Sequence, residues 1–373
     1  MKPIAFPRLS GAQVPSQDPV LARLPSWAAP LIDAAYARAG RGEDNGHESD
    51  VDDVLKLCAE HGARLALPGG GRTAERFAVL AALGRADLTT ARVFEAHTDA
   101  LAIIAESGAP LDSGKTWGVF AAEAAGTRLT AAPAEQTSAG PGPGPGPGPG
   151  DTVSLTGEKP WCSLGGVLDA ALVTAHIGEQ RGLFAVDLRR DDVRADPPHG
   201  WVARGLRAVP SGSVHFAGTP ATPVGNPGWY LRRAGFAWGG IGVAACWHGG
   251  ARGVADTLTR APRRRDGDDI GAMHVGAVDA ALHASAAALT SAAHAIDSSA
   301  VADPAMLALR TRAVVASAAE QVLRHAGHAL GPAPLAFDAA HAARVADLTL
   351  YLRQHHGERD LAALGRAVLA ASE

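Results

Sequence analysis

The chain contains little cysteine, few aromatic residues and no strong excess of positive or negative charge. Its three cysteines lie far apart and in no paired spacing, which argues against a disulfide framework or a zinc site and favours a reducing compartment. Aromatic residues make up 5% of the sequence and the formal net charge is −4, so no basic surface indicates a nucleic acid or a membrane as a partner.

Long apolar segments are also absent. The N-terminal stretch MKPIAFPRLSGAQ lacks the apolar core of a signal peptide, and no run reaches the about 18 apolar residues of a membrane span. We therefore expect a soluble cytoplasmic protein. Its 373 residues are enough to bury a large core in two or three domains.

Helical periodicity dominates the first part of the chain. Ser49 and Asp52 form a helix-start signal, and apolar residues follow at helical spacing until Gly62. The run GGGR at residues 69–72 lacks the Lys-Ser/Thr and the preceding strand of a phosphate loop, so we interpret it as a loop between helices. Helices are predicted over residues 28–39, 49–62, 73–83 and 87–106.

Strand-like sequence begins near Gly114 and continues to about residue 224. Strands are predicted over residues 117–122, 152–155, 170–176, 182–188 and 213–217. Between the first two, the repeat GPGPGPGPGPG at residues 140–150 cannot pack, because proline removes hydrogen-bond donors and glycine adds chain entropy. We expect a mobile hairpin loop there; the alternative is a linker between domains.

Helical spacing returns from residue 236 and predicts four long amphipathic helices, over residues 237–258, 270–296, 303–327 and 339–369. Short connections between such helices are typical of a bundle. The predicted architecture is multi-domain α+β: an N-terminal all-helical domain over residues 1–113, a middle β domain of small barrel or sandwich type over 114–232 with the mobile loop at 139–150, and a C-terminal four-helix bundle over 233–373.

One stretch, LTGEKPWCSLGG at residues 155–166, combines a strand with a turn that displays Trp161 and Ser163. Trp161 taken alone is compatible with an aromatic residue at the edge of a core. The pattern Gly-x-Lys-x-Trp-x-Ser, followed by Asp169 and an apolar strand, resembles the middle-domain signature of the acyl-CoA dehydrogenase superfamily. That superfamily has the same order of a helical domain, a β domain and a four-helix bundle, and the resemblance covers roughly residues 50–370.

The resemblance implies a bound flavin, FAD or alternatively FMN. Trp161 would then cover the flavin ring and the Ser163 hydroxyl would reach the N5 edge. Ala122 and Glu123 end a strand that in the family contacts the flavin pyrimidine; Ala122 replaces a threonine there, so main-chain contacts remain. The Gly-Ser-Asp segment that touches acyl-CoA in the family is absent from this chain.

For the adenine and diphosphate, the family provides an arginine before one bundle helix and a glycine-rich motif near the end of another. In this chain these positions fall on Arg265, one of three consecutive arginines, and on Gly327; His274 stands where the family often has glutamine. Three adjacent arginines more usually belong to a solvated loop, which is the alternative here.

The family's catalytic base, a glutamate in Tyr-Glu-Gly-Thr, falls near Arg353 in this chain, and arginine cannot act as a base at neutral pH. The nearest titratable groups are His355, His356 and Glu358, which are also compatible with a solvated helix surface. Adjacent histidines on a helix point in different directions, so we expect no metal site. Flavin monooxygenases of the same fold lack the glutamate and use histidines near the flavin; His97, Ser163 and His355 or His356 resemble that set. A satisfied interior or surface position is the alternative for His97.

The resemblance implies an FAD-dependent oxidoreductase of lipid metabolism that desaturates an acyl thioester such as acyl-CoA at its α,β bond, with hydride transfer to flavin N5 and an electron-transfer protein as acceptor. The first alternative is a reduced-flavin-dependent monooxygenase that needs a separate flavin reductase. The second is a catalytically silent protein that binds flavin or acyl-CoA. A homodimer or homotetramer is expected, because the family's flavin site is shared between subunits.

Overall fold

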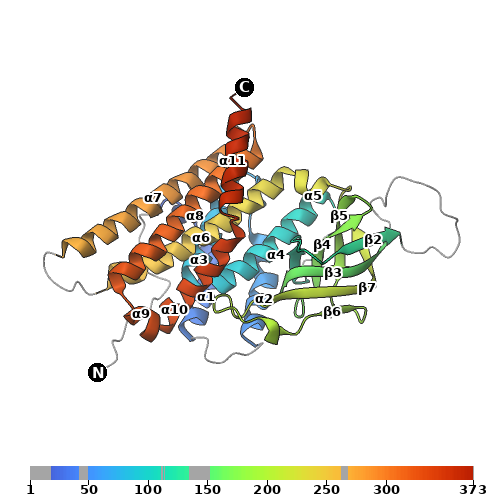
Figure 1. Cartoon of the computed structure of the whole chain (residues 1–373), viewed down its shortest axis with the longest axis horizontal. Helices are drawn as coiled ribbons and strands as arrows, with labels where there is room; N and C mark the ends of the chain where they lie inside the picture. The colour runs from blue at the N-terminus through green and yellow to red at the C-terminus, as the bar shows by residue number, and fades with distance from the viewer. Residues whose placement is uncertain are drawn as a thin grey trace.

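A computed structural model describes residues 18–41, 49–110, 112, 114–133, 152–261 and 268–372. Within these residues the chain forms eleven α-helices and seven strands, with the strands between two helical regions. The Gly-Pro repeat and Arg265 lie outside the described residues. Figure 1 shows an elongated molecule with long helices at one end and a compact barrel of strands at the other.

The N-terminal region contains four helices, as the periodicity predicts: α1 (Ala29–Arg41), α2 (Ser49–His61), α3 (Thr73–Ala86) and α4 (Leu88–Ser107). The run at residues 69–72 is a loop, as expected, and the Asp297 carboxylate binds the main-chain N–H of Thr73 at 2.9 Å. Asp87 caps α4 by accepting a hydrogen bond from the main chain of Thr90. Gly108, with a φ of 71°, ends α4 in the left-handed conformation.

The middle strands form one closed sheet. Its elements are β1 (Trp117–Phe120), β2 (Leu129–Pro133), β3 (Val153–Ser163), β4 (Ala170–Ile177), β5 (Gln180–Asp187), β6 (Val193–Ala195) and β7 (Ser211–Pro223). The pairing order β4-β2-β3-β7-β5 returns to β4 because β4 also pairs with β5, which closes the small barrel. The barrel alternative of the sequence prediction is the correct one.

The C-terminal region packs four long helices together: α6 (Ala234–Arg260), α7 (Asp269–Asp297), α8 (Pro304–Leu330) and α10 (Ala339–Tyr351). Short helices α5 (Trp229–Arg232) and α9 (Ala333–Phe337) connect them to their neighbours. Helix α6 lies directly against α3. A Cβ atom at Gly249 would come within 2.0 Å of the Ala81 carbonyl oxygen, so glycine is required for this close approach, as the small residues of α6 predict.

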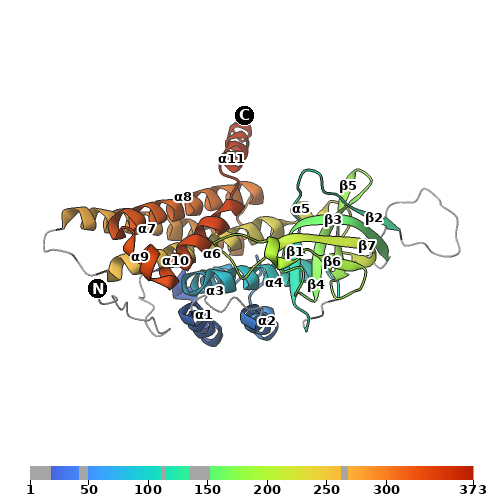
Figure 2. The same ribbon diagram turned by 60° about the horizontal axis from the view of Figure 1, so that its bottom comes forward.

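The prediction of one helix over residues 339–369 is wrong. Helix α10 ends at Tyr351, the 3-10 turn η5 (Leu352–Gln354) follows, and α11 (Glu358–Ala370) starts after Gly357, whose φ of 56° no continuous helix allows. The Asp360 carboxylate accepts a hydrogen bond from the main chain of His356 and stabilises the new helix start. Helix α11 projects away from the body and buries none of its described residues (Figure 2).

The barrel is fastened to the bundle by the segment that precedes β7. Leu206 donates its main-chain N–H to the Asp347 carboxylate on α10 at 2.5 Å. A Cβ atom at Gly205 would come within 2.1 Å of the Ala346 carbonyl oxygen. The domain boundaries at residues 113 and 232 stay predictions. No helix among the described residues is long and apolar enough to cross a membrane.

Candidate functional site

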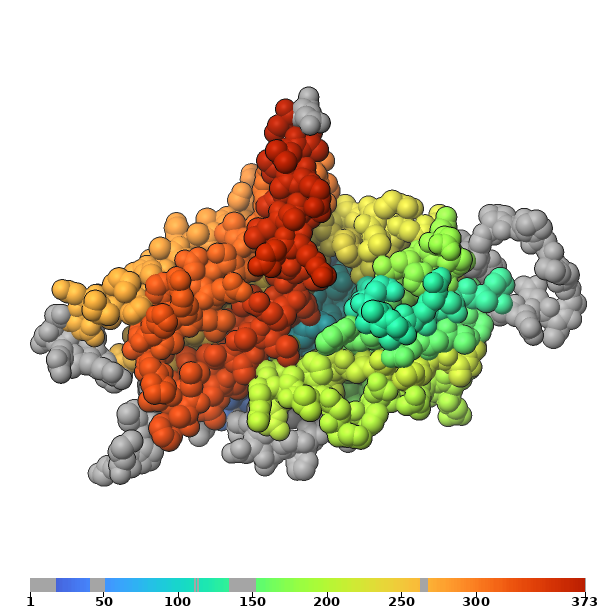
Figure 3. All heavy atoms as spheres, in the orientation of Figure 1, coloured from blue at the N-terminus to red at the C-terminus, as the bar shows by residue number. Residues whose placement is uncertain are grey.

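A recess opens between the C-terminal helices and the barrel. Figure 3 shows it as a hollow between the red surface of α10 and α11 and the green surface of the strands, with α4 visible at its floor. From the barrel, Ser163 at the end of β3 contacts Arg92 of α4, and from the C-terminal helices Tyr351 at the end of α10 contacts Glu95 of α4. This is the junction of barrel and bundle where the sequence predicts the flavin.

Trp161 and Ser163 stand at the barrel side. The pairing of β3 with β7 is irregular between Lys159 and Cys162, and Trp161 adopts a φ of 61°, a conformation that a bulky residue rarely takes. Its ring is 58% exposed, although the residues beside it are buried. The irregularity therefore presents a large flat ring outward instead of packing it.

The Ser163 hydroxyl lies 2.8 Å from the Ser211 hydroxyl on β7 and 3.4 Å from Nη2 of Arg92 on α4. Barrel and N-terminal helices therefore meet at this hydroxyl. An exposed aromatic face beside a partly buried hydroxyl fits the needs of an isoalloxazine ring, which stacks on aromatic side chains and accepts or donates hydrogen bonds along its edge.

The floor of the recess carries a buried charge pair on α4. Arg92 donates from Nη1 to the Glu95 carboxylate at 3.0 Å, and the Tyr351 hydroxyl donates to the same carboxylate oxygen at 3.3 Å. Burial raises the pKa of Glu95, although the positive charge of Arg92 opposes the shift. Tyr351 packs edge-on against Trp247 of α6, with ring centroids 6.3 Å apart.

His355 stands at the break between α10 and α11. Its ring meets the edge of Trp247 at 6.4 Å, and its Nδ1 accepts a hydrogen bond from the Gly357 main chain at 3.3 Å. Its Nε2 is buried, lies 3.9 Å from the Asp360 carboxylate and has no hydrogen-bond partner among the described residues. Burial lowers the pKa of His355; the nearby Asp360 carboxylate opposes the shift and Arg312 adds to it.

The other predicted catalytic residues near the C-terminus face outward. His356 is 66% exposed and binds Asp360 through Nδ1 at 3.1 Å, and Glu358 is an exposed residue of the first turn of α11. Arg353, where the family glutamate was expected, points to the surface and pairs with Glu320 of α8 at 2.5 Å. The structure thus brings His355, and neither His356 nor Glu358, to the inner side of the break.

His97 is 1% exposed and lies inside the N-terminal helices. Its Nδ1 accepts a hydrogen bond from the Trp117 main chain at 3.2 Å, and the ring also bonds to the main chain of Cys58. Burial lowers its pKa to about 4. Both ring nitrogens are therefore used to tie α4 to α2 and β1, which matches the alternative of a satisfied interior histidine and leaves no nitrogen for catalysis.

Ala122 and Glu123 follow β1 and are exposed. Lys159, only 2% exposed, donates to the Glu123 carboxylate at 2.7 Å, and Arg181 lies 3.0 Å from it. Although partial burial opposes it, the hydrogen bond from Lys159 lowers the pKa of Glu123. This carboxylate is a permanently charged anchor for the strand end, and the flavin contacts predicted for both residues stay predictions.

Gly327 is exposed on α8, 15 residues or about 22 Å along the helix from Arg312. Its carbonyl oxygen accepts the hydrogen bond from Gly331 that ends the helix. His274 of α7 contacts His325, two residues before Gly327 on α8, at 2.9 Å between their Nδ1 atoms. Gly327 therefore does not join the recess of its own chain, and its role at the far end of a cofactor stays a prediction.

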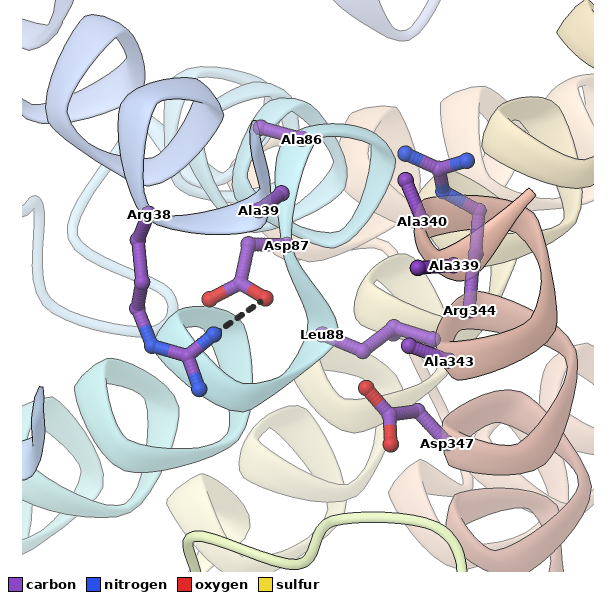
Figure 4. Close-up of a pocket in the computed structure, with 10 residues that line it drawn as sticks. All are labelled: Arg38, Ala39, Ala86, Asp87, Leu88, Ala339, Ala340, Ala343, Arg344 and Asp347. Carbon is purple, nitrogen blue, oxygen red and sulfur yellow. Dashed lines mark hydrogen bonds and ion pairs between the residues drawn. The ribbon is translucent and has the colours of Figure 1, made fainter. Parts of the chain in front are cut away.

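Two further cavities lie away from the recess. One, of about 30 Å³, has Arg38 and Asp87 on one side and Arg344 and Asp347 of α10 on the other (Figure 4). It has room for about one water molecule. The other is an open groove of about 650 Å³ beside the start of α3, where Asp297 already binds the free N–H of Thr73.

Sequence reasoning missed much of the helical side of the recess, namely Arg92, Glu95, Trp247, Arg312 and Asp360. Arg92 and Glu95 recur three residues apart on a helix that is otherwise largely apolar, and this is a detectable signal for a buried polar function. Trp247 and Arg312, whose guanidinium lies 4.7 Å from the tryptophan ring centroid, come from helices distant in sequence, and no local pattern marks them.

No protein-family model matches the sequence, and neither does any curated protein sequence. Solved structures do match. KijD3 in complex with FMN and a dTDP-linked amino sugar is 17% identical with a TM-score of 0.74, over 98% of this chain and 97% of that one. The glutaryl-CoA dehydrogenase of Mycobacterium smegmatis is 17% identical with a TM-score of 0.71, over 93% and 95%.

FMN-bound TdsC from Paenibacillus sp. A11-2, a dibenzothiophene monooxygenase, is 15% identical with a TM-score of 0.70, over 94% of this chain and 97% of that one. At these identities the likeness concerns the fold alone. Both resemblances found in the sequence, to acyl-CoA dehydrogenases and to flavin monooxygenases, are confirmed at that level: this chain has the fold that these enzymes share.

Proposed function

We propose that this protein is a flavin-dependent oxidoreductase that acts as a monooxygenase with reduced flavin supplied by a separate reductase. The observation that supports it most is the contrast between the positions of Arg353 and His355. Where a dehydrogenase needs a carboxylate, Arg353 turns to the surface, while His355 is neutral and keeps a buried, unpaired Nε2 among the described residues.

In this proposal Trp161 and Ser163 hold FMN or FAD at the barrel side. Bound reduced flavin would supply two electrons for oxygen activation, with one oxygen atom entering the product and the other leaving as water. The residues of this chain bind and orient the flavin and exclude water. The Trp161 face stacks on the ring, Ser163 bonds the ring edge, and the Trp247–Tyr351 pair closes the floor. Because Nδ1 of His355 accepts the Gly357 N–H, the neutral ring carries its proton on Nε2 and donates it from there.

The experiment supplies reduced FMN through a flavin reductase with NADH and oxygen, and screens aromatic and polar substrates by mass spectrometry for the gain of one oxygen atom. With a substrate in hand, His355→Asn is expected to lower product formed per reduced FMN by about 100-fold or more, because a positioned acid or base contributes that much. His356→Gln is the matched control, since its side chain is exposed, and it keeps the activity. Equal activity of the two variants would contradict the role of His355.

A second candidate is desaturation of an acyl thioester with an electron-transfer protein as acceptor. It is favoured by Glu95, a buried carboxylate at the floor whose pKa is raised by burial. Anaerobic titration of the FAD-loaded protein with acyl-CoAs tests it: bleaching of the visible flavin bands that is lost in Glu95→Gln would establish this reaction. Bands that persist with every thioester exclude it. Bound flavin without product in either assay supports a silent binding protein.

For the assembly we propose a homodimer or homotetramer, in which Arg265 and Gly327 of one chain approach the cofactor of another. Light scattering during size-exclusion chromatography measures the mass directly. If the wild-type protein is a monomer and still binds flavin, the site is not shared between chains.

A further inference from the structure

The floor of the recess has an unusual composition for a surface that would receive a hydrocarbon. Arg92, Glu95 and Asp99 follow one another at spacings of three and four residues, so they share one face of α4. Their side chains are 15%, 8% and 16% exposed. Three charged groups therefore line a mostly buried face of a helix whose other residues are largely apolar.

The charges extend inward through partners on other elements. Arg233, just before α6, donates to Glu106 at 2.5 Å and lies 3.9 Å from Asp99. Arg76 of α3 is buried and donates to the Ala66 carbonyl oxygen at 3.0 Å. Among the described residues, one carboxylate oxygen of Asp99 and the Nε atoms of Arg76 and Arg233 are buried without a hydrogen-bond partner. The network is polar but incompletely satisfied.

An apolar chain placed against this face would remove water from the charges and return no hydrogen bond. Such desolvation is costly for buried charged groups, whereas a ligand with its own polar atoms compensates it. The face therefore favours a polar ligand over a fatty acyl chain or an unsubstituted aromatic ring.

Arg92 determines the sign of the charge that the recess prefers. Arg92 reaches Ser163, and its hydrogen bonds to Glu95 and Ser163 use two of the five N–H donors of a guanidinium. One oxygen of the Glu95 carboxylate accepts from both Arg92 and Tyr351. The end of α4 nearest the barrel is therefore a donor-rich cation at the edge of the recess.

We propose that Arg92 binds an oxyanion of the substrate, a carboxylate or phosphate group, so that this protein acts on a small polar anion and not on a hydrocarbon acyl chain. The guanidinium fork matches the two oxygens of such a group. Glu95 and Tyr351 are positioning residues that hold the fork toward Ser163. This inference rests on the proposed function for the location of the reaction, but the anion site itself is defined by α4.

The test measures binding of three probes of similar size, benzoate, phenyl phosphate and benzyl alcohol, by isothermal titration calorimetry to FMN-loaded and to flavin-free protein. The wild-type protein is expected to bind at least one anion about 10-fold or more tightly than the alcohol, the range of a charge-assisted hydrogen-bonded pair. Whichever of benzoate and phenyl phosphate binds more tightly shows whether the substrate group is a carboxylate or a phosphate. Arg92→Met abolishes the preference, and Arg92→Lys retains part of it.

Controls distinguish a loss of anion binding from a loss of folding and from a loss of cofactor binding. Arg353→Gln removes an exposed arginine and leaves anion binding unchanged; circular dichroism and the Tm show that each variant is folded. Equal binding of the alcohol and the anions, or an undiminished preference in Arg92→Met, overturns the proposal. Loss of FMN affinity in Arg92→Met with unchanged anion binding also overturns it, because Arg92 then serves the cofactor. Failure of wild-type protein to bind any flavin refutes the proposed function, while the flavin-free titration still decides the anion site.

Discussion

Trp161 stands on the barrel side of the recess, whereas Trp247 lies inside the helices and packs against Tyr351, which bonds to Glu95 at the floor; the two rings differ in almost every physical respect. Trp161 is 58% exposed on a strand irregularity, whereas Trp247 is fully buried among Tyr351, His355 and Arg312. The first is presented by a dozen consecutive residues, and the second, on α6, is enclosed by side chains from two other helices and a turn. The comparison shows that the two sides of the site are built differently: the barrel side by a local motif, the helical side by assembly of the whole chain.

Replacing Trp247 should have the largest effect. Trp247→Ala is expected to lower the free energy of unfolding by about 3–5 kcal/mol, because it leaves a cavity at the centre of three helices. Trp247→Phe keeps most of the packing and removes the indole N–H, which is unpaired among the described residues, so it should cost clearly less. Urea unfolding followed by circular dichroism measures both. A loss below about 1 kcal/mol in Trp247→Ala would show that the helical side does not depend on this ring.

The buried His97 should make the stability of the protein depend on pH. Its pKa falls from 6.5 when unfolded to about 4 in the folded protein, so the unfolded chain binds more protons between these values. The contribution of His97 to the free energy of unfolding is therefore fully present above pH 6.5. It decreases by roughly 3 kcal/mol as the pH falls toward 4.

The measurement is the free energy of unfolding in urea from pH 7 down to pH 4 for the wild type and for His97→Gln. The variant should be less stable at pH 7 and should lose this part of the pH dependence. His356→Gln is a suitable control because its side chain is exposed. A wild-type slope that His97→Gln leaves intact would assign the pH dependence to other groups.

Trp161 should show the smallest effect on stability and a clear effect on the cofactor. Trp161→Ala is expected to change the free energy of unfolding by less than about 0.5 kcal/mol, because the ring packs against little. The affinity for oxidised FMN, measured by flavin fluorescence, should fall by roughly 2- to 10-fold with the loss of a stacking face. Trp161→Phe should restore part of that affinity. Unchanged affinity in Trp161→Ala would remove the barrel side from the flavin site.

Most helices and strands outside the C-terminus followed from periodicity because their apolar residues repeat at 3.6 or 2 positions; the short strands β2 and β6 were not predicted. The break at Gly357 was missed because leucines occur on both sides of it, Leu348 and Leu352 before and Leu361 and Leu364 after, with no proline between them. A glycine in a helical pattern and one at a left-handed position look the same in sequence. In the structure, the left-handed Gly357 and the hydrogen bond from the His356 main chain to the Asp360 carboxylate mark the start of the new helix.

The sequence by itself determined the order of the helical and barrel regions and the display of Trp161 and Ser163. It also carries the resemblance from which a flavin at the junction of barrel and bundle is expected. Each of these depends on residues close together in the chain. The tertiary structure decided which titratable groups meet at that place. It enclosed His97 with main-chain partners, turned His356 and Arg353 outward, and brought Arg92, Glu95, Tyr351 and His355 to one recess. Burial and pairing depend on contacts between distant segments, and these contacts set the charge and the proton affinity of each group.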